Sequence, residues 1–269
     1  MKILVACPSK ARSETISKNT LKFIQNDYFS FDFKVFVEPQ DHTKYRNQTD
    51  QLIVLADNDQ GLAYVKKTIQ QYAINNKYDY VFKIDDDVNN IRLPELIGSK
   101  KNKIIIDKSQ LFQKRVEALN LLIEDSLELF EEYNNTIGAV SLMYGSDFHA
   151  YTGQTWLSFN NRLQSNYIIK TSLLCNDIQA MCYEDFVTFL NVLANDYNTI
   201  RYGLTALEVE PVGKNAGGVQ SFNRNKQSLV EMKLIQQKYP EVIWKKVEGK
   251  GWDYEPDFRA TKSIKTMKI

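Results

Sequence analysis

The sequence has few cysteines, and their positions do not indicate a disulfide framework. Cys7, Cys175 and Cys182 are an odd number and include no closely spaced pair of the kind that binds a metal. Reduced thiols in a cytoplasm are the simplest account of the three. The sequence therefore indicates neither a disulfide scaffold nor a cysteine-based metal site.

The sequence also lacks a net charge and a long apolar run. Its 34 Lys and Arg residues against 33 Asp and Glu residues leave a formal net charge of +1, so no global field attracts nucleic acid or an anionic membrane. The first apolar segment is too short for the hydrophobic region of a signal peptide and is interrupted by Pro8. No segment approaches the length of a membrane span. We expect a soluble, cytoplasmic protein without a membrane partner.

No internal repeat or low-complexity linker divides the chain. The 269 residues are 43% hydrophobic, which is an ordinary globular composition and enough to bury a substantial core. We expect a single domain over residues 1–269.

Strands and helices are expected to alternate in the first third of the chain. Short runs rich in β-branched residues predict strands at residues 3–9, 33–38, 52–55 and 80–84. Apolar residues at helical spacing predict helices at 15–24 and from 62 to 72, whereas the polar segment 40–50 is expected to be a loop. This alternation favours a parallel sheet with helices on both faces.

The rest of the chain has a different rhythm. Residues 111–133 and 186–193 are expected to form helices, and 230–237 a third. Strands are expected at 137–143, 167–170 and 200–209, separated by an aromatic and polar loop at 144–166. A glycine-rich turn follows at 211–219.

The most informative stretch is the segment 79–88. Its buried-looking strand, residues 80–84, ends abruptly in Asp85, Asp86 and Asp87. Because side chains alternate along a strand, Asp85 and Asp87 are expected on one side and Asp86 on the other. Two carboxylates at a strand end suit Mg²⁺ or Mn²⁺ and leave room for substrate phosphates. Three adjacent acids alone usually form a solvated turn, but the preceding strand favours the metal site.

Two further motifs follow the three acids later in the chain. Glu184-Asp185 opens the helix expected near residue 186, and Lys214 precedes Ala216-Gly217-Gly218. With the acids 85–87 at the place of an Asp-x-Asp motif, this order resembles a GT-A-type glycosyltransferase. Residues 80–87, 183–186 and 214–218 are similar, more narrowly, to the TET-associated glycosyltransferases of phages and some eukaryotic proteins, which are implicated in decorating oxidised pyrimidines in DNA.

The resemblance implies an α/β fold, a GT-A-like Rossmann-type mixed sheet flanked by helices. Residues 1–90 would form the nucleotide-sugar-binding half, 91–225 the acceptor and catalytic half, and 226–269 a C-terminal extension. The enzyme would move a hexosyl or pentosyl group from a nucleotide sugar, with a UDP-sugar favoured, to a hydroxyl acceptor. It would act in the host cytoplasm if the protein is phage-encoded.

Such a transfer builds negative charge on the departing diphosphate, which a divalent metal offsets. Asp85 and Asp87 would hold Mn²⁺ or Mg²⁺, or one would do so while the other orients the ribose. The side chains expected to border the donor lie at strand ends and in the glycine-rich turn: Pro8, Ser9, Lys10, Arg12, Glu38, Asp57, Asp59, Gly61, Asp86, Lys214, Gly217 and Gly218. Gly61 and the Gly-Gly pair are equally typical of plain turns.

The acceptor hydroxyl needs a base on the far side of the anomeric carbon. Asp185 is the candidate base, and Glu184 would bind the acceptor or the sugar. Acids at a helix start also complement the helix dipole without any catalytic part, which is the alternative interpretation.

One departure concerns the metal. Many metal-dependent GT-A enzymes take a third ligand from a C-terminal histidine, and this chain has only His42 and His149. The third ligand would have to be another residue, such as Asn215, or water.

If DNA is the acceptor, a modified base would be reached in the major groove or flipped between aromatic side chains. His149, Tyr151 and Trp156 are the candidate acceptor-binding residues. Phosphate contacts would need local basic patches, with candidates at 100–103, 224–226 and 262–268.

Other functions remain open. A glycan, lipid-linked or protein acceptor and a Mg²⁺-dependent nucleotidyltransferase are both compatible with the strand-end acids. A non-enzymatic binding module leaves three consecutive acids unexplained.

Overall fold

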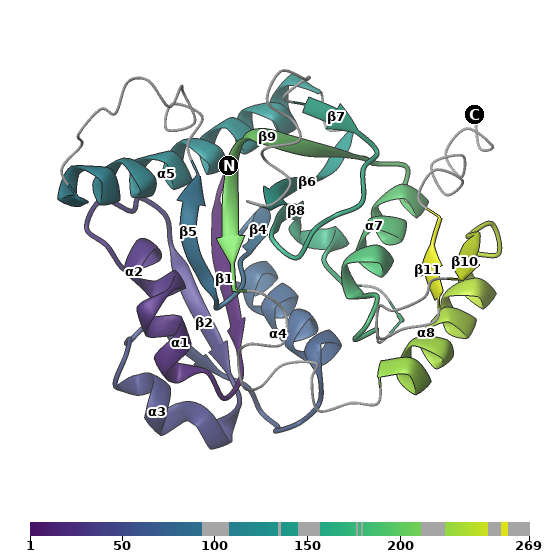
Figure 1. Ribbon diagram of the computed structural model, residues 1–269, viewed down its shortest axis with the longest axis horizontal. Coiled ribbons are helices and arrows are strands. Elements are labelled where there is room, and N and C mark those ends of the chain that lie inside the picture. The colour runs from purple at the N-terminus through teal and green to yellow at the C-terminus, as the bar shows by residue number, and fades with distance from the viewer. Residues whose placement is uncertain are drawn as a thin grey trace.

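The computed structural model describes residues 1–92, 108–133, 136–144, 157–175, 177–178, 180–210, 224–246 and 254–257. Within these residues the main feature is a nine-stranded mixed sheet (Figure 1). Its strands are β1 (Ile3–Ser9), β2 (Phe33–Val37), β3 (Leu52–Val54), β4 (Tyr80–Lys83), β5 (Val88–Arg92), β6 (Ile137–Tyr144), β7 (Leu157–Phe159), β8 (Tyr167–Lys170) and β9 (Asn198–Val209). A small separate sheet pairs β10 (Trp244–Lys246) with β11 (Tyr254–Pro256).

Helices and short 3₁₀ turns connect the strands. They are α1 (Ser13–Lys18), α2 (Thr20–Ile24), η1 (Pro39–Asp41), α3 (His42–Arg46), α4 (Leu62–Asn75), α5 (Lys108–Glu132), η3 (Thr171–Leu173), α7 (Glu184–Ala194) and α8 (Arg224–Lys238). No helix in the described ranges is long and apolar enough to cross a membrane.

The first four strands run parallel in the order β3-β2-β1-β4. Their carboxyl ends therefore meet at one edge of the sheet, where ligands bind in folds of this kind. The parallel arrangement expected from the alternation of the first ninety residues is confirmed.

The second half of the sheet is mixed. Strand β8 is antiparallel to both β4 and β6, β6 is parallel to β9, and β5 closes the edge antiparallel to β9. The chain thus passes from β4 in the middle of the sheet to β5 at its edge through a single short connection, the segment 84–87.

Each face of the sheet has its own hydrophobic core. Along β1, Ile3, Val5 and Cys7 face a core shared with α1, α2 and α5, whereas Leu4 and Ala6 face one shared with α4, α7 and α8. This strict alternation is what a strand buried on both faces requires. The two groups of helices cover opposite faces of the sheet.

Close packing between α7 and β6 depends on Gly138. A Cβ at this position would lie 2.7 Å from side-chain atoms of Leu173 and Tyr197 and 2.8 Å from Val192. No larger residue fits without displacing them.

Some local expectations were wrong. The segment 40–50, expected to be a loop, contains η1 and α3, because the fully buried Tyr45 anchors a helical turn against β1. The helix expected at 15–24 is two short helices that meet at Asn19, and β5 and β7 were not anticipated. The expected glycine-rich turn at 211–219 lies outside the described residues.

Candidate active site

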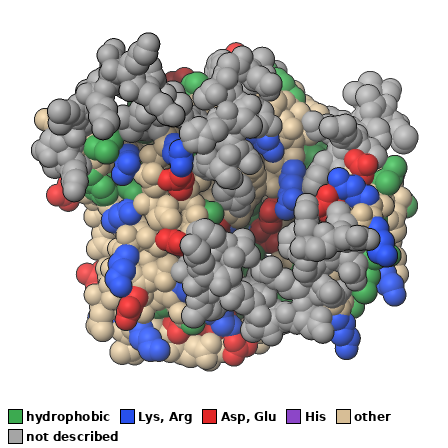
Figure 2. All heavy atoms as spheres, viewed as in Figure 1, with side chains coloured by type: hydrophobic (Ala, Val, Ile, Leu, Met, Phe, Trp, Pro, Cys, Tyr) green, Lys and Arg blue, Asp and Glu red, His purple; other side chains and the backbone are tan. Residues whose placement is uncertain are grey.

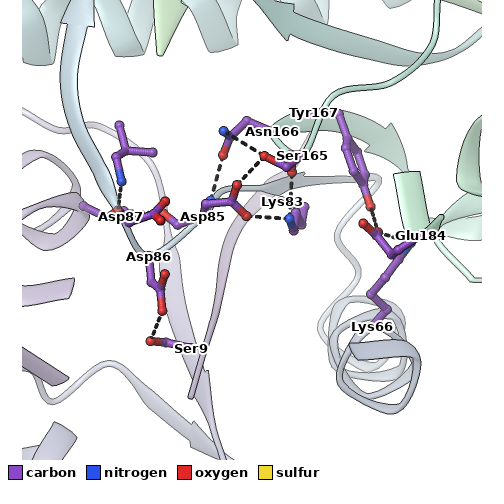
Figure 3. A network of polar contacts seen from close by, with 12 residues as sticks. Ser9, Lys66, Lys83, Asp85, Asp86, Asp87, Ser165, Asn166, Tyr167 and Glu184 are labelled. Carbon is purple, nitrogen blue, oxygen red and sulfur yellow. Dashed lines mark hydrogen bonds and ion pairs between the residues drawn. The ribbon is translucent and has the colours of Figure 1, made fainter. Parts of the chain in front are cut away.

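The three consecutive acids lie in the connection between β4 and β5 (Figure 3). Strand β4 ends at Lys83, so strand alternation does not extend to Asp85–Asp87. Each carboxylate has its own contacts instead. Figure 3 shows Asp86 directed to Ser9, away from the side chains that hold Asp85.

Asp85 is held on both carboxylate oxygens. Lys83 Nζ lies 2.6 Å from Oδ1, and the Ser165 hydroxyl donates to Oδ2. Its backbone N–H donates to Asn166 Oδ1 at 2.7 Å, and Thr20 Oγ1 donates to its carbonyl oxygen at 2.6 Å. Asp85 is therefore fixed in place between β4, β8 and α2.

Asp86 is buried and fully paired. Its carboxylate accepts a hydrogen bond from Ser9 Oγ at 2.5 Å and one from Arg12 Nη1 at 2.9 Å. Ser9 in turn contacts the Tyr45 hydroxyl at 2.6 Å. These contacts attach the acid turn to the end of β1.

Asp87 is the least compensated acid of the three. Its side chain is 15% exposed, and its carboxylate lies 3.6 Å from Arg12 Nη1. Burial raises the pKa of Asp87 to about 7, and the neighbouring charges of Asp85 and Asp86 add to the effect. A cation placed beside this carboxylate would offset the cost of burying its charge and the repulsion from Asp85 and Asp86.

The donor set suits a hard divalent cation that keeps open positions for phosphate oxygens. The described residues contain no cluster of three His, Cys, Asp or Glu side chains arranged around one point. Since both oxygens of Asp85 already accept hydrogen bonds, Asp87 is the better candidate for a metal ligand and Asp85 the better candidate for orienting the donor.

The neighbouring strand ends form a second polar cluster. Lys10, after β1, pairs with Glu38 at 2.9 Å and with the exposed Asp59. Glu38 is buried after β2 and also accepts the Asp59 backbone N–H at 3.0 Å. The structure thus brings together Lys10, Glu38 and Asp59, three residues that were predicted to bind the nucleotide-sugar donor.

The other predicted donor residues in this half are more peripheral. Pro8 is half-buried in β1, and Asp57 is exposed with the Tyr64 hydroxyl 3.4 Å from its carboxylate. Gly61 precedes α4 with φ at 81°. Glycine adopts this φ readily, so the backbone conformation explains why a glycine occupies this position.

Glu184 and Asp185 open α7 but have different surroundings. Glu184 is buried, with Lys66 Nζ 2.7 Å and the Tyr167 hydroxyl 3.0 Å from its carboxylate. Burial alone would raise the pKa of Glu184, but Lys66 and Lys83 outweigh it and lower the pKa. Its carboxylate is therefore committed to contacts within the protein.

Asp185 is more accessible, with 21% of its side chain exposed and Arg162 Nη2 3.2 Å away. Burial raises its pKa, and Glu184 adds to the rise against the opposing charge of Arg162. A partly exposed carboxylate with a raised pKa is suited to accept a proton.

Lys83 contacts Asp85 in the acid turn and also interacts electrostatically with Glu184 in α7. Burial lowers the pKa of this lysine, but Asp85 and Glu184 outweigh that effect and hold the pKa above its ordinary value. Figure 3 shows its ammonium directed to Asp85 and to the Ser165 carbonyl, at 2.6 and 2.7 Å. Sequence reasoning missed Lys83, although a lysine within the apolar run 80–84 is a signal that could have found it.

Two cations beside the acid turn also escaped sequence reasoning. Lys22 Nζ donates to the Asn89 carbonyl at 2.7 Å, and Arg115 has a buried Nε with no hydrogen-bond partner. The rings of Phe23 and Phe112 stack at 5.5 Å and bring α2 against α5. Burial lowers the pKa of Lys22, and the charge of Arg115 lowers it further. Figure 2 shows Lys and Arg side chains among acids along this side of the molecule.

Most of the remaining predicted residues fall in two segments, 145–156 and 211–223. His149, Tyr151 and Trp156, proposed for the acceptor, and Lys214, Asn215, Gly217 and Gly218 lie outside the described residues. His42 lies in α3 and is half-buried.

The described residues form a nine-stranded mixed sheet flanked by helices, as in the GT-A-like class of fold. The expected fold class is confirmed by solved structures. The chain aligns with Staphylococcus aureus TarS 1-349 in complex with UDP-GlcNAc at a TM-score of 0.55 and 14% identity, covering 88% of this chain and 66% of that one. It aligns with the mannosyltransferase PcManGT from Pyrobaculum calidifontis, in complex with GDP-Man and Mn²⁺, at a TM-score of 0.53 and 16% identity, covering 98% and 69%.

The family model of the TET-Associated Glycosyltransferases matches residues 3–218. The chain belongs to this glycosyltransferase family. No curated protein matches it. The chain spans only 60 to 66% of the first matched TarS chains, and the likeness to solved structures defines the fold alone.

Proposed function

We propose that the protein is a metal-dependent glycosyltransferase that moves a sugar from a nucleotide-sugar donor, with a UDP-sugar favoured, to a hydroxyl acceptor. The observation that carries this proposal is Asp87, an undercompensated carboxylate at the carboxyl edge of the parallel strands. The family membership and the nucleotide-sugar complexes of TarS and PcManGT support the donor class.

Asp87 would hold the metal ion, and Asp85 would orient the donor beside it. When bound, Mn²⁺ or Mg²⁺ would offset the charge that develops on the departing diphosphate. Lys83 keeps Asp85 in one orientation through its 2.6 Å contact, and Arg12 fixes Asp86 so that the turn presents Asp87.

Asp185 would take the proton from the acceptor hydroxyl as that oxygen attacks the anomeric carbon. Its raised pKa makes it a stronger base than an ordinary aspartate. Glu184, held by Lys66 and Tyr167, would keep the first turn of α7 in place rather than touch the substrate.

The test uses Asp87→Asn and Asp185→Asn, with the exposed Asp27→Asn as a matched control. UDP-sugars are screened by thermal shift with and without Mn²⁺, and transfer is then measured with the responding donor. We expect Asp87→Asn to lose both the Mn²⁺-dependent shift and transfer. We expect Asp185→Asn to keep the shift and lose transfer by about 100-fold or more, the scale of general-base catalysis. Full transfer in Asp87→Asn or in excess chelator would refute the metal site, and full transfer in Asp185→Asn would refute the base.

For the acceptor, we propose a hydroxymethylated pyrimidine in DNA. The family supports this class, and so does the pair Lys22 and Arg115 beside the acid turn, to which no carboxylate of the described residues is bonded. Two such cations suit phosphate oxygens.

The acceptor test compares DNA oligonucleotides with and without hydroxymethylated bases, and a glycan and a protein substrate. In Lys22→Ala and Arg115→Ala, we expect DNA binding to weaken and the slope of log affinity against log salt to fall by about 1 for each lost phosphate contact. Transfer only to the glycan or protein substrate would refute the DNA acceptor while leaving the transferase intact.

A further inference from the structure

The start of α7 is capped by a carboxylate from a distant helix. Glu231, in α8, is 0% exposed, and its two oxygens accept hydrogen bonds from three consecutive backbone N–H groups. These belong to Met181 at 2.9 Å, Cys182 at 2.9 Å and Tyr183 at 3.1 Å. The next residues along the chain are Glu184 and Asp185.

Helix α7 needs such a partner. The first N–H groups of a helix and of the turn before it lack intrahelical acceptors, and the residue at the helix cap usually supplies one from its own side chain. Here the cap residue is Tyr183, and it makes no side-chain cap hydrogen bond. Glu231 instead accepts from the N–H groups of the cap residue and of the two residues before it, and its negative charge also complements the positive end of the helix dipole.

The position of Glu231 is itself well determined. A buried carboxylate is unfavourable unless its oxygens are hydrogen-bonded, and the three N–H groups meet that need together with the Gln227 side-chain amide at 2.9 Å. The Tyr183 hydroxyl adds a second link, because it donates to the Tyr254 carbonyl at 2.7 Å, and the Tyr183 ring packs edge-on against Trp244. Glu231, Trp244 and Tyr254 thus hold in place the peptide that leads into α7.

We propose that Glu231 is a positioning residue of the active site, which fixes the turn that presents Asp185 to the acceptor. This inference rests on the proposed role of Asp185 as the base. Glu231 lies beyond residue 218, where the family match ends, so the matched region does not contain this part of the site. The C-terminal extension is then part of the catalytic unit.

The experiment compares Glu231→Ala and Glu231→Gln in the full chain, with the exposed Glu241→Gln as the matched control. Turnover, the dissociation constant of the donor with Mn²⁺, and the pH profile of kcat/KM are measured for each variant. A misplaced catalytic group lowers turnover by up to about 100-fold. We expect Glu231→Ala to lose about 10- to 100-fold in kcat while donor affinity stays within about twofold, since the residues proposed to bind the donor lie at the ends of β1, β2 and β4. Glu231→Gln, which keeps one accepting oxygen, should lose less.

The pH profile separates positioning from a general loss of packing. The charged groups around Asp185 are Glu184 on its own helix, Arg162 before β8 and Lys83 on β4, and none of them changes in Glu231→Gln. Removing the Glu231 charge leaves the positive end of α7 less compensated, with only Glu184 and Asp185 in its first turn, so we expect the acid limb of the profile to move to lower pH. Glu241→Gln should leave it in place.

Glu231→Gln with unchanged turnover and an unchanged acid limb would overturn the inference, even if Glu231→Ala fails to fold. A parallel loss of donor affinity, turnover and melting temperature would also overturn it, because that is the result of a purely structural role. The proposed function fails separately, through full transfer in Asp185→Asn.

Discussion

Replacing Lys66 by Met tests whether the buried ion pair organises the start of α7. Lys66 is 4% exposed, and its ammonium lies 2.7 Å from Glu184 and 2.5 Å from Thr188 Oγ1. Methionine keeps most of the side-chain volume but leaves the Glu184 carboxylate buried without its nearest cation. Removing one partner of a buried pair costs about 3–5 kcal/mol of unfolding free energy. We expect the lower end, about 3 kcal/mol, because Lys83 still acts on Glu184.

The assay is urea unfolding followed by circular dichroism, with Lys18→Met as the control. Lys18 pairs with Glu14 on the surface, with side chains 77% and 85% exposed, and its loss should cost less than about 0.5 kcal/mol. The pKa of Glu184 is lowered in the folded protein from an ordinary value of 4.5. The stability that its ion pair supplies is therefore present above that value and is lost as the pH falls below it.

The difference in unfolding free energy between the wild type and Lys66→Met should accordingly become smaller as the pH is lowered. The double variant Lys66→Met with Glu184→Gln should recover part of the loss, because no buried charge remains. A destabilisation no larger than that of Lys18→Met, or a gap independent of pH, would refute this account of the pair.

Two further predictions concern single positions. In Asp87→Asn, we expect the metal-free protein to become more stable at pH 8 by up to about 4 kcal/mol while transfer is lost, because each unit by which the pKa of Asp87 is raised disfavours its ionised form in the folded protein by about 1.4 kcal/mol. This stabilisation should decrease as the pH falls from about 7 towards the ordinary value of 3.8, and an unchanged or lower unfolding free energy at pH 8 would contradict it. In Gly138→Ala, a Cβ 2.7 Å from Leu173 and Tyr197 should cost about 1–3 kcal/mol in urea unfolding, and a neutral result would show that α7 and η3 shift freely over β6.

The fold was largely predictable from the sequence, because the strands of the parallel half are buried on both faces and read as short apolar runs. Strands β1 to β4 were placed within one residue, and the expected helix at 62–72 ended three residues before α4 does. Strand β5 was missed because its sequence, Val88-Asn89-Asn90-Ile91-Arg92, is polar, and its pairing with β9 is set by tertiary contacts rather than by a local pattern. Helix α3 was missed because only Tyr45 among its residues is buried.

The candidate site was predictable where charge interrupts an apolar pattern. The acids 85–87 stood out for that reason, and the structure brings the predicted Ser9, Arg12 and Asp86 into direct contact. The assignment of Asp85 and Asp87 to one strand face rested on a strand that ends earlier, at Lys83. Glu231 and Lys66 could not be found, because a glutamate or lysine on a helix gives no local sign that a distant partner buries it.

The placement of the acid turn has a consequence for synthesis on the ribosome. The turn joins β4 to β5, and β5 gains its only described strand partner in β9, whose Glu208 contacts Asn90 from 118 residues further along the chain. The four parallel strands can associate as soon as the first ninety residues emerge. Asp86 can already contact Ser9 and Arg12 at that stage, but we expect the far side of the acid turn, where β5 begins, to be fixed only after β9 has been translated, because pairing over such a sequence distance comes late in folding. We therefore expect a nascent chain arrested before residue 198 to have formed the parallel half of the sheet without a complete cation site. Such a chain should not bind the sugar donor while the rest of the enzyme is still being made.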